Sequence, residues 1–476
     1  MRLSIALLTL LLLAACGREP AITAADLTPC RLKGIEREAR CGHVTMPQNP
    51  DDPAGPSIEV HFAVLSALAR HPWPDPVFVF AGGPGQAGTQ IAAPVSAVLA
   101  PLNHRRDLVF IDSRGTGQSA AFHCQDESDT LSAFDPGRQA QRLAQCAKTA
   151  PIDPSQLATW IAVRDIDAVR ARLGAEKINL WGGSYGTRAE LEYLRQFPQR
   201  VRSAVLDGVA PPDMRLPVAI ALDAEAALDA LVKACAADAD CARRYPRLAD
   251  SIEQLLARAG FGKTIVVADP LTGQTETVTL SRELAAAWLR LPLYAPHLAA
   301  ALPHAITQAA AGHYEPLAAL VTGMSGAVAD NFAVGMHYSV VCSEDLPRIT
   351  ASDRAQANAT RLGAAVLKTY DAACAALPRR TVPAEFYEVG ASPVPVLLLS
   401  GGLDPATPPR HAAAMAERLG HARHLIAPML GHGISGQGCA PDLIARFIQQ
   451  ASLAGIDGDC LTRIPAPLFF NPPARP

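Results

Sequence analysis

Short, mainly apolar segments recur in two parts of the chain. They cover residues 76–80, 107–112, 178–181, 201–209 and 394–400. Strands that are buried on both faces of a parallel sheet have this pattern, because neither face meets water. We therefore predict a mostly parallel β-sheet.

Helix-period segments flank these runs. Apolar side chains recur three or four positions apart in residues 158–173 and 187–197, and a helix at 410–419 and a short strand at 425–427 follow the last run. Residues 57–68 instead begin by alternating apolar and polar side chains, which predicts a half-buried antiparallel strand at the start of the sheet. Strands that alternate with helices in this way predict an α/β fold.

Residues 214–391 have a different character. They are rich in alanine, and no apolar run among them would extend the parallel sheet. We predict a mainly helical cap, inserted between two halves of the α/β domain at residues 30–213 and 392–476. Side chains of such a cap usually determine which substrate is accepted. The helix-period segments of the cap are 218–235, 248–259, 281–289, 298–311 and 352–377.

The N-terminal residues have the pattern of an export signal. The apolar run at 3–15 is too short to span a membrane but suits a signal peptide, which we place at 1–15. The run ends in Leu-Ala-Ala-Cys-Gly, which resembles the bacterial lipobox. We therefore expect a lipid on Cys16 and a tether at 16–29, with ordinary cleavage and an incidental Cys16 as the alternative. Gly17 resembles the outer-membrane sorting pattern, so a periplasmic outer-membrane lipoprotein is expected, in contact with the membrane only through its lipid.

Ten further cysteines are consistent with export, because disulfides form in oxidising compartments. They fall along the chain as five close neighbours, so pairing each with the next is the simplest scheme, although spacing alone does not prove connectivity. The sequence has no C-x-x-C and no cysteines grouped with histidines at ligand spacing, so we expect no metal site. The ten are Cys30, Cys41, Cys124, Cys146, Cys235, Cys241, Cys342, Cys374, Cys439 and Cys460.

The charge balance argues against a nucleic-acid partner. The formal net charge is −3, and basic clusters such as residues 104–106 are short and isolated.

The motif that suggests chemistry is G-x-S-x-G at residues 182–186. An apolar run leads into it and a helix-period segment follows, so the context is strand, tight turn and helix. This is the pattern of a nucleophile elbow, in which a sharp turn exposes a serine hydroxyl above the edge of a parallel sheet. Ser184 is therefore the candidate nucleophile.

A loop with four glycines, residues 81–88, follows the apolar run at 76–80. Glycines leave backbone N–H groups accessible, as an oxyanion hole requires. We expect the N–H groups of Gly83 and Tyr185 to be the two donors. This loop does not have the pattern of a phosphate-binding loop, because it contains no G-K-[ST] and its glycine spacing is not that of a dinucleotide-binding loop.

Candidates for the acid and the base follow late in the chain. Asp404 lies in the loop after the run at 394–400, and His432 lies between glycines after the last strand. With Ser184 they have the order Ser, Asp, His, which is that of α/β-hydrolases. Asp207, at the end of another predicted strand, is the alternative acid. The alternative bases are His411 on a predicted helix and His421 and His424 beside a predicted strand.

Three motifs together resemble one family. These are Gly-Gly-Pro-Gly at 82–85, D-x-R-G-x-G-x-S at 112–119 and Gly-Gly-Ser-Tyr-Gly at 182–186. They look like those of the proline iminopeptidase and tripeptidyl aminopeptidase group of serine α/β-hydrolases, and the region through Cys439 and Cys460 resembles the C-terminal region of the latter. The resemblance implies the α/β-hydrolase fold and supports Asp404, which lies in a G-x-x-D-x-x-T-P setting like that of the relatives.

The resemblance also bears on structural residues and on the cap. Asp112 and Arg114 are expected to form an ion pair that fixes the loop beside the active site. Residues 338–345 resemble a cysteine-and-acid motif of the relatives, so Glu344 or Asp345 is the candidate to bind a substrate α-amino group. A disulfide-anchored helix cap is the structural alternative. Relatives often carry serine where this chain has Ala87, and proline preference is left open.

The function expected from these features is that of an exported serine hydrolase without a cofactor. The resemblance implies an aminopeptidase that releases short N-terminal units from peptides. The same catalytic residues serve carboxylic ester hydrolysis, because the fold does not determine the acyl group. A non-catalytic lipoprotein binding module is the remote alternative.

Overall fold

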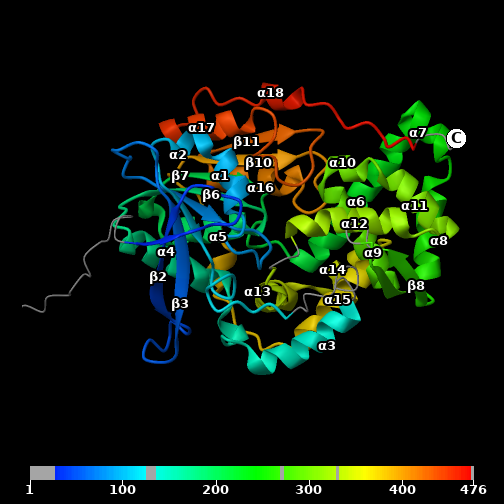
Figure 1. Ribbon diagram of the computed structural model, residues 1–476, viewed down its shortest axis with the longest axis horizontal. Coiled ribbons are helices and arrows are strands. Elements are labelled where there is room, and N and C mark those ends of the chain that lie inside the picture. Colours follow the sequence, from blue (N-terminus) through cyan, green and yellow to red (C-terminus); the bar gives the residue numbers. More distant parts are fainter. Residues whose placement is uncertain (1–26, 125–135, 269–272, 329–331, 473–476) are drawn as a thin grey trace, which may run out of the picture.

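The computed structural model describes residues 27–124, 136–268, 273–328 and 332–472. A sheet of nine strands has the order β1-β2-β3-β5-β4-β6-β7-β10-β11 (Figure 1). The first three strands are antiparallel to their neighbours, and the pairs from β5 to β11 are parallel. The strands are β1 (Thr28–Cys30), β2 (Ala39–Pro47), β3 (Ser57–Leu65), β4 (Val77–Phe80), β5 (Leu108–Ile111), β6 (Ile178–Gly183), β7 (Val201–Asp207), β10 (Val396–Gly401) and β11 (Ala422–Ala427).

The apolar runs become the centre of this sheet. Every residue of β4, β5 and β10 is buried. Side chains of alternate residues pack on opposite faces, so one face is covered by α4 (Thr159–Arg172), α5 (Tyr185–Gln196) and α16 (Pro409–Leu419). The other face is covered by α1 (Ala92–Val98), α2 (Ala100–Asn103) and α17 (Ala440–Gln450). The predicted α/β-hydrolase architecture, a mostly parallel sheet flanked by helices, is confirmed.

Between β7 and β10 the chain forms a mainly helical region with an apolar core of its own. In Figure 1 most of this region lies beside the sheet domain rather than within its layers. Its only strands among the described residues are β8 (Lys263–Ala268) and β9 (Thr275–Leu280), which pair with each other and not with the main sheet. Its helices are α6 (Leu216–Ala237), α7 (Ala239–Arg244), α8 (Leu248–Ala259), α9 (Arg282–Arg290), α10 (Pro296–Ala299), α11 (Leu302–Ala311), α12 (Glu315–Val328), α13 (Val334–Glu344), α14 (Ala351–Asn358) and α15 (Gly363–Ala375).

One predicted cap helix is in fact two. The segment 352–377 was expected to be continuous, but α14 ends at Asn358 and α15 begins at Gly363. The chain turns so tightly here that a Cβ on Gly363 would lie 1.9 Å from the carbonyl oxygen of Ala357. Periodicity alone missed this break, because apolar positions continue on both sides of it.

Four of the five predicted cysteine pairs are disulfides in the structure. These are Cys30–Cys41, Cys235–Cys241, Cys342–Cys374 and Cys439–Cys460. The fifth prediction is wrong for this structure: Cys124 and Cys146, the latter at the end of α3 (Pro136–Cys146), are free thiols that contact each other. Proximity in the chain brings the two sulfurs together but does not by itself provide the geometry of a covalent bridge.

The predicted ion pair between Asp112 and Arg114 is also wrong. The guanidinium of Arg114 binds both carboxylate oxygens of Asp165 on α4, at 2.7 and 2.8 Å. Asp112 instead accepts hydrogen bonds from the N–H and hydroxyl of Thr89 and from the N–H of Gln118. Both side chains are buried, so each anchors the loop after β5 to a different neighbour.

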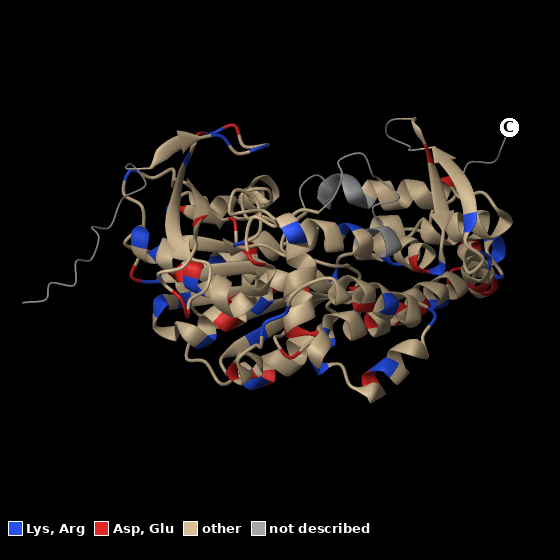
Figure 2. Cartoon of the chain, turned by 90° about the horizontal axis from the view of Figure 1, so that it is seen from below, with Lys and Arg blue, Asp and Glu red and all other residues tan. Residues whose placement is uncertain are grey.

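Positive and negative side chains are interspersed over both halves of the molecule (Figure 2). Within the described ranges, no helix is long and apolar enough to cross a membrane. The signal peptide, Cys16 and most of the predicted tether lie outside the described residues, so these remain predictions.

Candidate active site

The predicted nucleophile occupies a strained turn between β6 and α5. Ser184 has φ +57° and ψ −127°, a conformation that side chains other than glycine rarely adopt. Its N–H donates to the carbonyl oxygen of Asp207 at 2.8 Å. Gly186 is required because a Cβ there would lie 2.2 Å from the carbonyl oxygen of Phe80 on β4. Close packing of the helix on the sheet thus holds Ser184 at the end of β6.

Asp404 and His432 meet at the same edge of the sheet. Nδ1 of His432 lies 2.8 Å from Oδ2 of Asp404, which follows β10. The N–H groups of Ala406 and Thr407 donate to Oδ1 of Asp404, both at 2.8 Å. Burial alone would raise the pKa of Asp404, but His432 and these donors outweigh it, and the pKa is lowered. Asp404 is therefore a charged partner for the imidazole.

Asp207, the alternative acid, holds the backbone around the site instead. Its carboxylate accepts the N–H groups of Ile434 at 3.0 Å and Ser435 at 2.7 Å, in the loop that carries His432. Burial raises the pKa of Asp207 despite these hydrogen bonds. Because its carbonyl also binds the N–H of Ser184, Asp207 joins the nucleophile turn to the histidine loop.

Two contacts of His432 were not anticipated. The hydroxyl of Thr407 lies 2.8 Å from Oδ2 of Asp404 and 3.1 Å from Nδ1 of His432. Tyr294, from the cap, accepts the N–H of His432 at 3.0 Å through its carbonyl, and the two rings meet edge to face at 5.1 Å. Thr407 stood in the quoted G-x-x-D-x-x-T-P pattern, whereas no sequence signal marked Tyr294.

The glycine loop after β4 lies against the nucleophile turn. A Cβ on Gly82 would lie 3.4 Å from the Cβ of Ser184. Gly83 has φ +112°, and Tyr185 is the first residue of α5, where an N–H has no acceptor within the helix. The loop that carries Gly83 thus lies beside Ser184, and Tyr185 follows Ser184 directly. The role of their two N–H groups stays a prediction.

The cap covers this glycine loop. The N–H of Ala333 donates to the carbonyl of Gly85 at 2.9 Å. His337 on α13 lies 3.1 Å through Nδ1 from the carbonyl of Pro84 and 3.0 Å through Nε2 from the hydroxyl of Tyr370. Burial lowers the pKa of His337 to about 4, so a neutral imidazole with Nδ1 protonated fits these partners.

The alternative histidines have other partners. His411 lies 3.0 Å from the carboxylate of Asp223, while His424 binds the hydroxyl of Ser400 and His421 faces a backbone carbonyl. Of the four, only His432 contacts Asp404 among the described residues.

Glu344 and Asp345 form a buried ion cluster with Arg188 of α5. Arg188 lies 3.3 Å from Oε2 of Glu344 and binds both oxygens of Asp345 at 3.1 Å. Thr159 donates its N–H to Glu344 at 2.6 Å and its hydroxyl at 3.0 Å. All three charged side chains are at most 2% exposed. These contacts tie the end of α13 to the nucleophile helix, and amine binding by either carboxylate stays a prediction.

Replacing Glu344 with glutamine is expected to change how stability depends on pH. Burial raises the pKa of Glu344 to about 7, with Asp345 adding to the effect and Arg188 opposing it. The folded protein therefore holds a proton that the unfolded chain, with a glutamate pKa of about 4.3, has released. This contribution to stability is present at low pH and is lost as the pH rises through about 7.

Urea unfolding at pH 5 and pH 8 would measure this effect. From pH 5 to pH 8 the wild type should lose free energy of unfolding that Glu344→Gln keeps. The variant should therefore be more stable, relative to the wild type, at pH 8 than at pH 5. Glu417 is exposed, so Glu417→Gln is the matched control. Its difference in free energy of unfolding from the wild type should be the same at both pH values. Equal pH dependence in Glu344→Gln and the wild type would contradict a protonated Glu344.

Metal ligands are not evident in the part of the chain that the structure describes. No group of three or more His, Cys, Asp or Glu side chains there is placed to hold an ion.

A serine at a strained turn and a histidine paired with a buried aspartate, all at the carboxyl edge of the sheet, define an α/β-hydrolase site. Residues 75–232 match the family described as alpha/beta hydrolase fold, and residues 359–460 match the family described as TAP-like protein. The chain therefore has the α/β-hydrolase fold, and its C-terminal region matches the TAP-like family. The resemblance to the proline iminopeptidase and tripeptidyl aminopeptidase group is confirmed.

Three relatives illustrate the similarity. Serine protease Hip1 of Mycobacterium tuberculosis (strain ATCC 25618 / H37Rv) is 32% identical over 209 residues, which are 40% of this chain and 40% of Hip1. Tripeptidyl aminopeptidase of Streptomyces lividans is 31% identical over 196 residues, 37% of this chain and 36% of that protein. Proline iminopeptidase of Neisseria meningitidis serogroup B (strain ATCC BAA-335 / MC58) is 31% identical over 102 residues, 21% and 24% of the two chains. The chain thus covers 40% of the length of Hip1 and less of the other two.

Proposed function

We propose that the protein is an exported serine hydrolase that releases short N-terminal units from peptides through an acyl-enzyme. The observation that carries the proposal is the 2.8 Å contact between His432 and Asp404 at the sheet edge where Ser184 stands. The peptidase names of the relatives support a peptide substrate.

The geometry supports a defined role for each group. Nδ1–H of His432 donates to Asp404, which leaves the lone pair of Nε2 free to take the proton of the Ser184 hydroxyl. Ser184 then attacks the substrate carbonyl, and the N–H groups of Gly83 and Tyr185 would stabilise the oxyanion. The proton passes from His432 to the leaving amine, and water, activated by the same histidine, hydrolyses the acyl-enzyme.

The dependence of kcat/KM on pH should reflect His432. Burial acts to lower the pKa of His432, but the Asp404 carboxylate reverses this and the pKa ends above its ordinary value. Because the neutral imidazole is the base, kcat/KM should fall on the acid side with a midpoint above about 6.5. Initial rates measured between pH 4 and pH 9 at low substrate concentration test this, and a midpoint well below 6.5 would contradict the assignment.

Matched substrates would test the proposed reaction. The protein without residues 1–16 would be assayed on peptide anilides with free and with acetylated N-termini and on a short-chain nitrophenyl ester. Cleavage of only the free-amine anilides, absent in Ser184→Ala, is the expected result. Equal cleavage of acetylated and free anilides would contradict an aminopeptidase.

Ester hydrolysis is the second candidate, and one observation favours it. An aminopeptidase needs a carboxylate that is open to the substrate amine, yet Arg188 and Thr159 already bind Glu344 and Asp345. Ester turnover without anilide cleavage would favour this candidate and exclude the peptidase.

Export and lipidation are part of the proposal. Four disulfides are typical of proteins that fold in an oxidising compartment. When the full chain is expressed in a Gram-negative host, the protein should incorporate radiolabelled palmitate. The labelled protein should be found in the outer membrane of the host. Cys16→Ser should abolish labelling, and labelling that persists in this variant would exclude Cys16 as the lipidated residue.

A further inference from the structure

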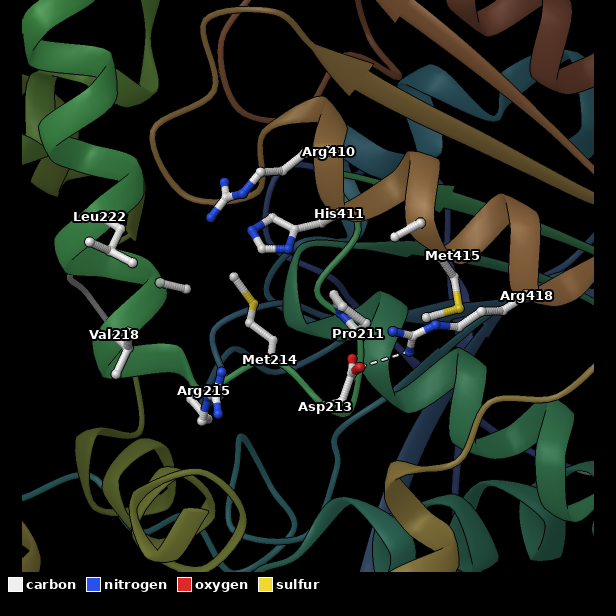
Figure 3. Close-up of a pocket in the computed structure, with 12 residues that line it drawn as sticks. Pro211, Asp213, Met214, Arg215, Val218, Leu222, Arg410, His411, Met415 and Arg418 are labelled. Carbon is white, nitrogen blue, oxygen red and sulfur yellow. Dashed lines mark hydrogen bonds and ion pairs between the residues drawn. The ribbon is translucent and has the colours of Figure 1, made fainter. Parts of the chain in front are cut away.

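A cavity of about 310 Å³ lies where the cap meets the sheet domain. Its walls come from α6 on one side, α16 on the other and the segment after β7 between them (Figure 3). Its volume is that of a small-molecule site. Ser184, Asp404 and His432 are not among its lining residues, so it is separate from the catalytic groups.

Three arginines and a histidine line the cavity. Arg215, Arg410 and Arg418 line it together with His411, and Figure 3 shows His411 and Arg410 directed toward the space beside α6. Asp213 is the one carboxylate among the described residues that line it. Each arginine is paired with an aspartate, Arg215 with Asp353, Arg410 with Asp223 and Arg418 with Asp213, so an anion would bind through the guanidinium donors that these pairs leave free.

Carboxylates in and behind the wall hold two of these arginines in place. Asp223, with a side chain only 2% exposed, binds Arg410 and lies 3.0 Å from Nε2 of His411. Arg418 binds Asp213 at 2.7 Å. Within the described residues these hydrogen bonds engage one terminal nitrogen of each arginine. Since a guanidinium has five N–H donors, both arginines keep donors for a ligand.

The remaining wall is apolar. Val218 and Leu222 of α6 face Met415 of α16, and Met214 extends between the two helices (Figure 3). Methionine side chains adapt to ligands of different shape. A simple inorganic anion would leave this surface without a partner.

We infer that the cavity binds a small carboxylate with a hydrocarbon body, held by Arg410 and Arg418 at its charged end and by the α6 and α16 side chains along its length. Such a ligand bridges the cap and the sheet domain. Two sources have this chemistry: a fatty acid, and a short apolar peptide with a free C-terminus. The inference does not rest on the proposed function, because the site excludes the catalytic residues.

Calorimetric titration of full-length Ser184→Ala, which removes turnover, tests the inference. The probes are octanoate, N-acetyl-leucyl-leucine, octylamine and inorganic phosphate. Octanoate, N-acetyl-leucyl-leucine or both should bind. Tighter binding of octanoate would indicate a fatty acid, and tighter binding of N-acetyl-leucyl-leucine would indicate a peptide C-terminus. Octylamine and phosphate should bind at least roughly tenfold more weakly, because each lacks one of the two complementary features.

Additional substitutions in the Ser184→Ala protein test where the carboxylate binds. Arg410→Gln and Arg418→Gln should each weaken carboxylate binding by roughly tenfold, as expected for loss of a charged hydrogen bond. Arg243→Gln, which breaks an exposed Arg–Asp pair on α7, is the matched control and should bind as before. Melting temperatures would show that each variant is folded. Of the two cavity variants, Arg418→Gln should disturb folding less, because the Asp213 partner that it leaves is 32% exposed, whereas Asp223, the partner of Arg410, is 2% exposed. Absence of carboxylate binding, equal binding of phosphate, or binding unchanged in Arg418→Gln would each overturn the inference.

Discussion

Replacing Ser184 with alanine should lower kcat/KM by about 10⁴-fold or more on whichever substrate the protein accepts. Alanine removes the hydroxyl that attacks the carbonyl but keeps a Cβ at this turn. The surrounding contacts, from the N–H of Ser184 to Asp207 and from Thr187 to the carbonyl of Ser184, involve the backbone of residue 184 and should persist. Initial rates and the melting temperature, measured together, would separate lost chemistry from lost folding.

Glycine at the same position gives a second readout. Ser184 has φ +57°, which costs about 1–3 kcal/mol for a residue with a Cβ, while glycine adopts it freely. Ser184→Gly should therefore be as inactive as Ser184→Ala. It should also be more stable to urea than both Ser184→Ala and the wild type. Activity retained in both variants would exclude Ser184 as the nucleophile, and the binding-module alternative would then gain support.

Replacing Asp404 with asparagine should lower kcat by about 10⁴-fold. An asparagine amide facing Nδ1 favours the wrong tautomer of His432, because Nδ1 would then have to accept rather than donate. The carboxylate also stabilises the imidazolium that forms during the reaction, which a neutral amide cannot do. Single-turnover rates on an activated ester or anilide would measure the loss.

Asp207→Asn is the matched control. Its oxygen can still accept one of the two N–H groups of residues 434 and 435, but its NH₂ cannot accept the other. We expect a lower melting temperature and a loss of kcat at least roughly tenfold smaller than in Asp404→Asn, because the contact between Asp404 and His432 remains. A larger loss of kcat in Asp207→Asn would reverse the assignment of the acid.

A weaker effect is expected at Thr407. Valine has the same shape but no hydroxyl, so Thr407→Val removes the donor to Oδ2 of Asp404 while the N–H of residue 407 still binds Oδ1. Loss of one charged hydrogen bond should reduce kcat by roughly tenfold and shift the acid limb of the pH profile. An unchanged pH profile would mean that the hydroxyl does not act through the Asp404–His432 pair.

The local features of the site were predictable because each depends on neighbours in the chain. The apolar runs at 76–80 and 107–112 are β4 and β5, and the glycines around Ser184 form the expected turn. Strand ends in a parallel sheet lie at one edge, so loops after β6 and β10 were expected to meet. The sequence alone therefore predicted the fold class and the three candidate catalytic residues.

The tertiary structure decided which of several similar residues make contact. Both Asp207 and Asp404 follow strands, and only the packing of the loops brings Asp404 to His432 and turns Asp207 toward the backbone. Spacing predicted a pair between Asp112 and Arg114, but Arg114 reaches Asp165 on α4. These choices depend on distances across the fold, which chain spacing does not contain.

The cap shows the same limit over longer separations. Arg188 and Glu344 lie 156 positions apart in sequence, and Arg410 and Asp223 lie 187 apart. The motif at 338–345 marked the carboxylates but not the arginine that binds them, and nothing in the sequence joined α6 to α16 around a cavity. The sequence by itself determined the secondary structure, the sheet and the catalytic motif, because periodicity and glycine spacing are local. Only the tertiary structure decided which charges are paired and where a cavity opens, because these depend on how helices from distant parts of the chain pack.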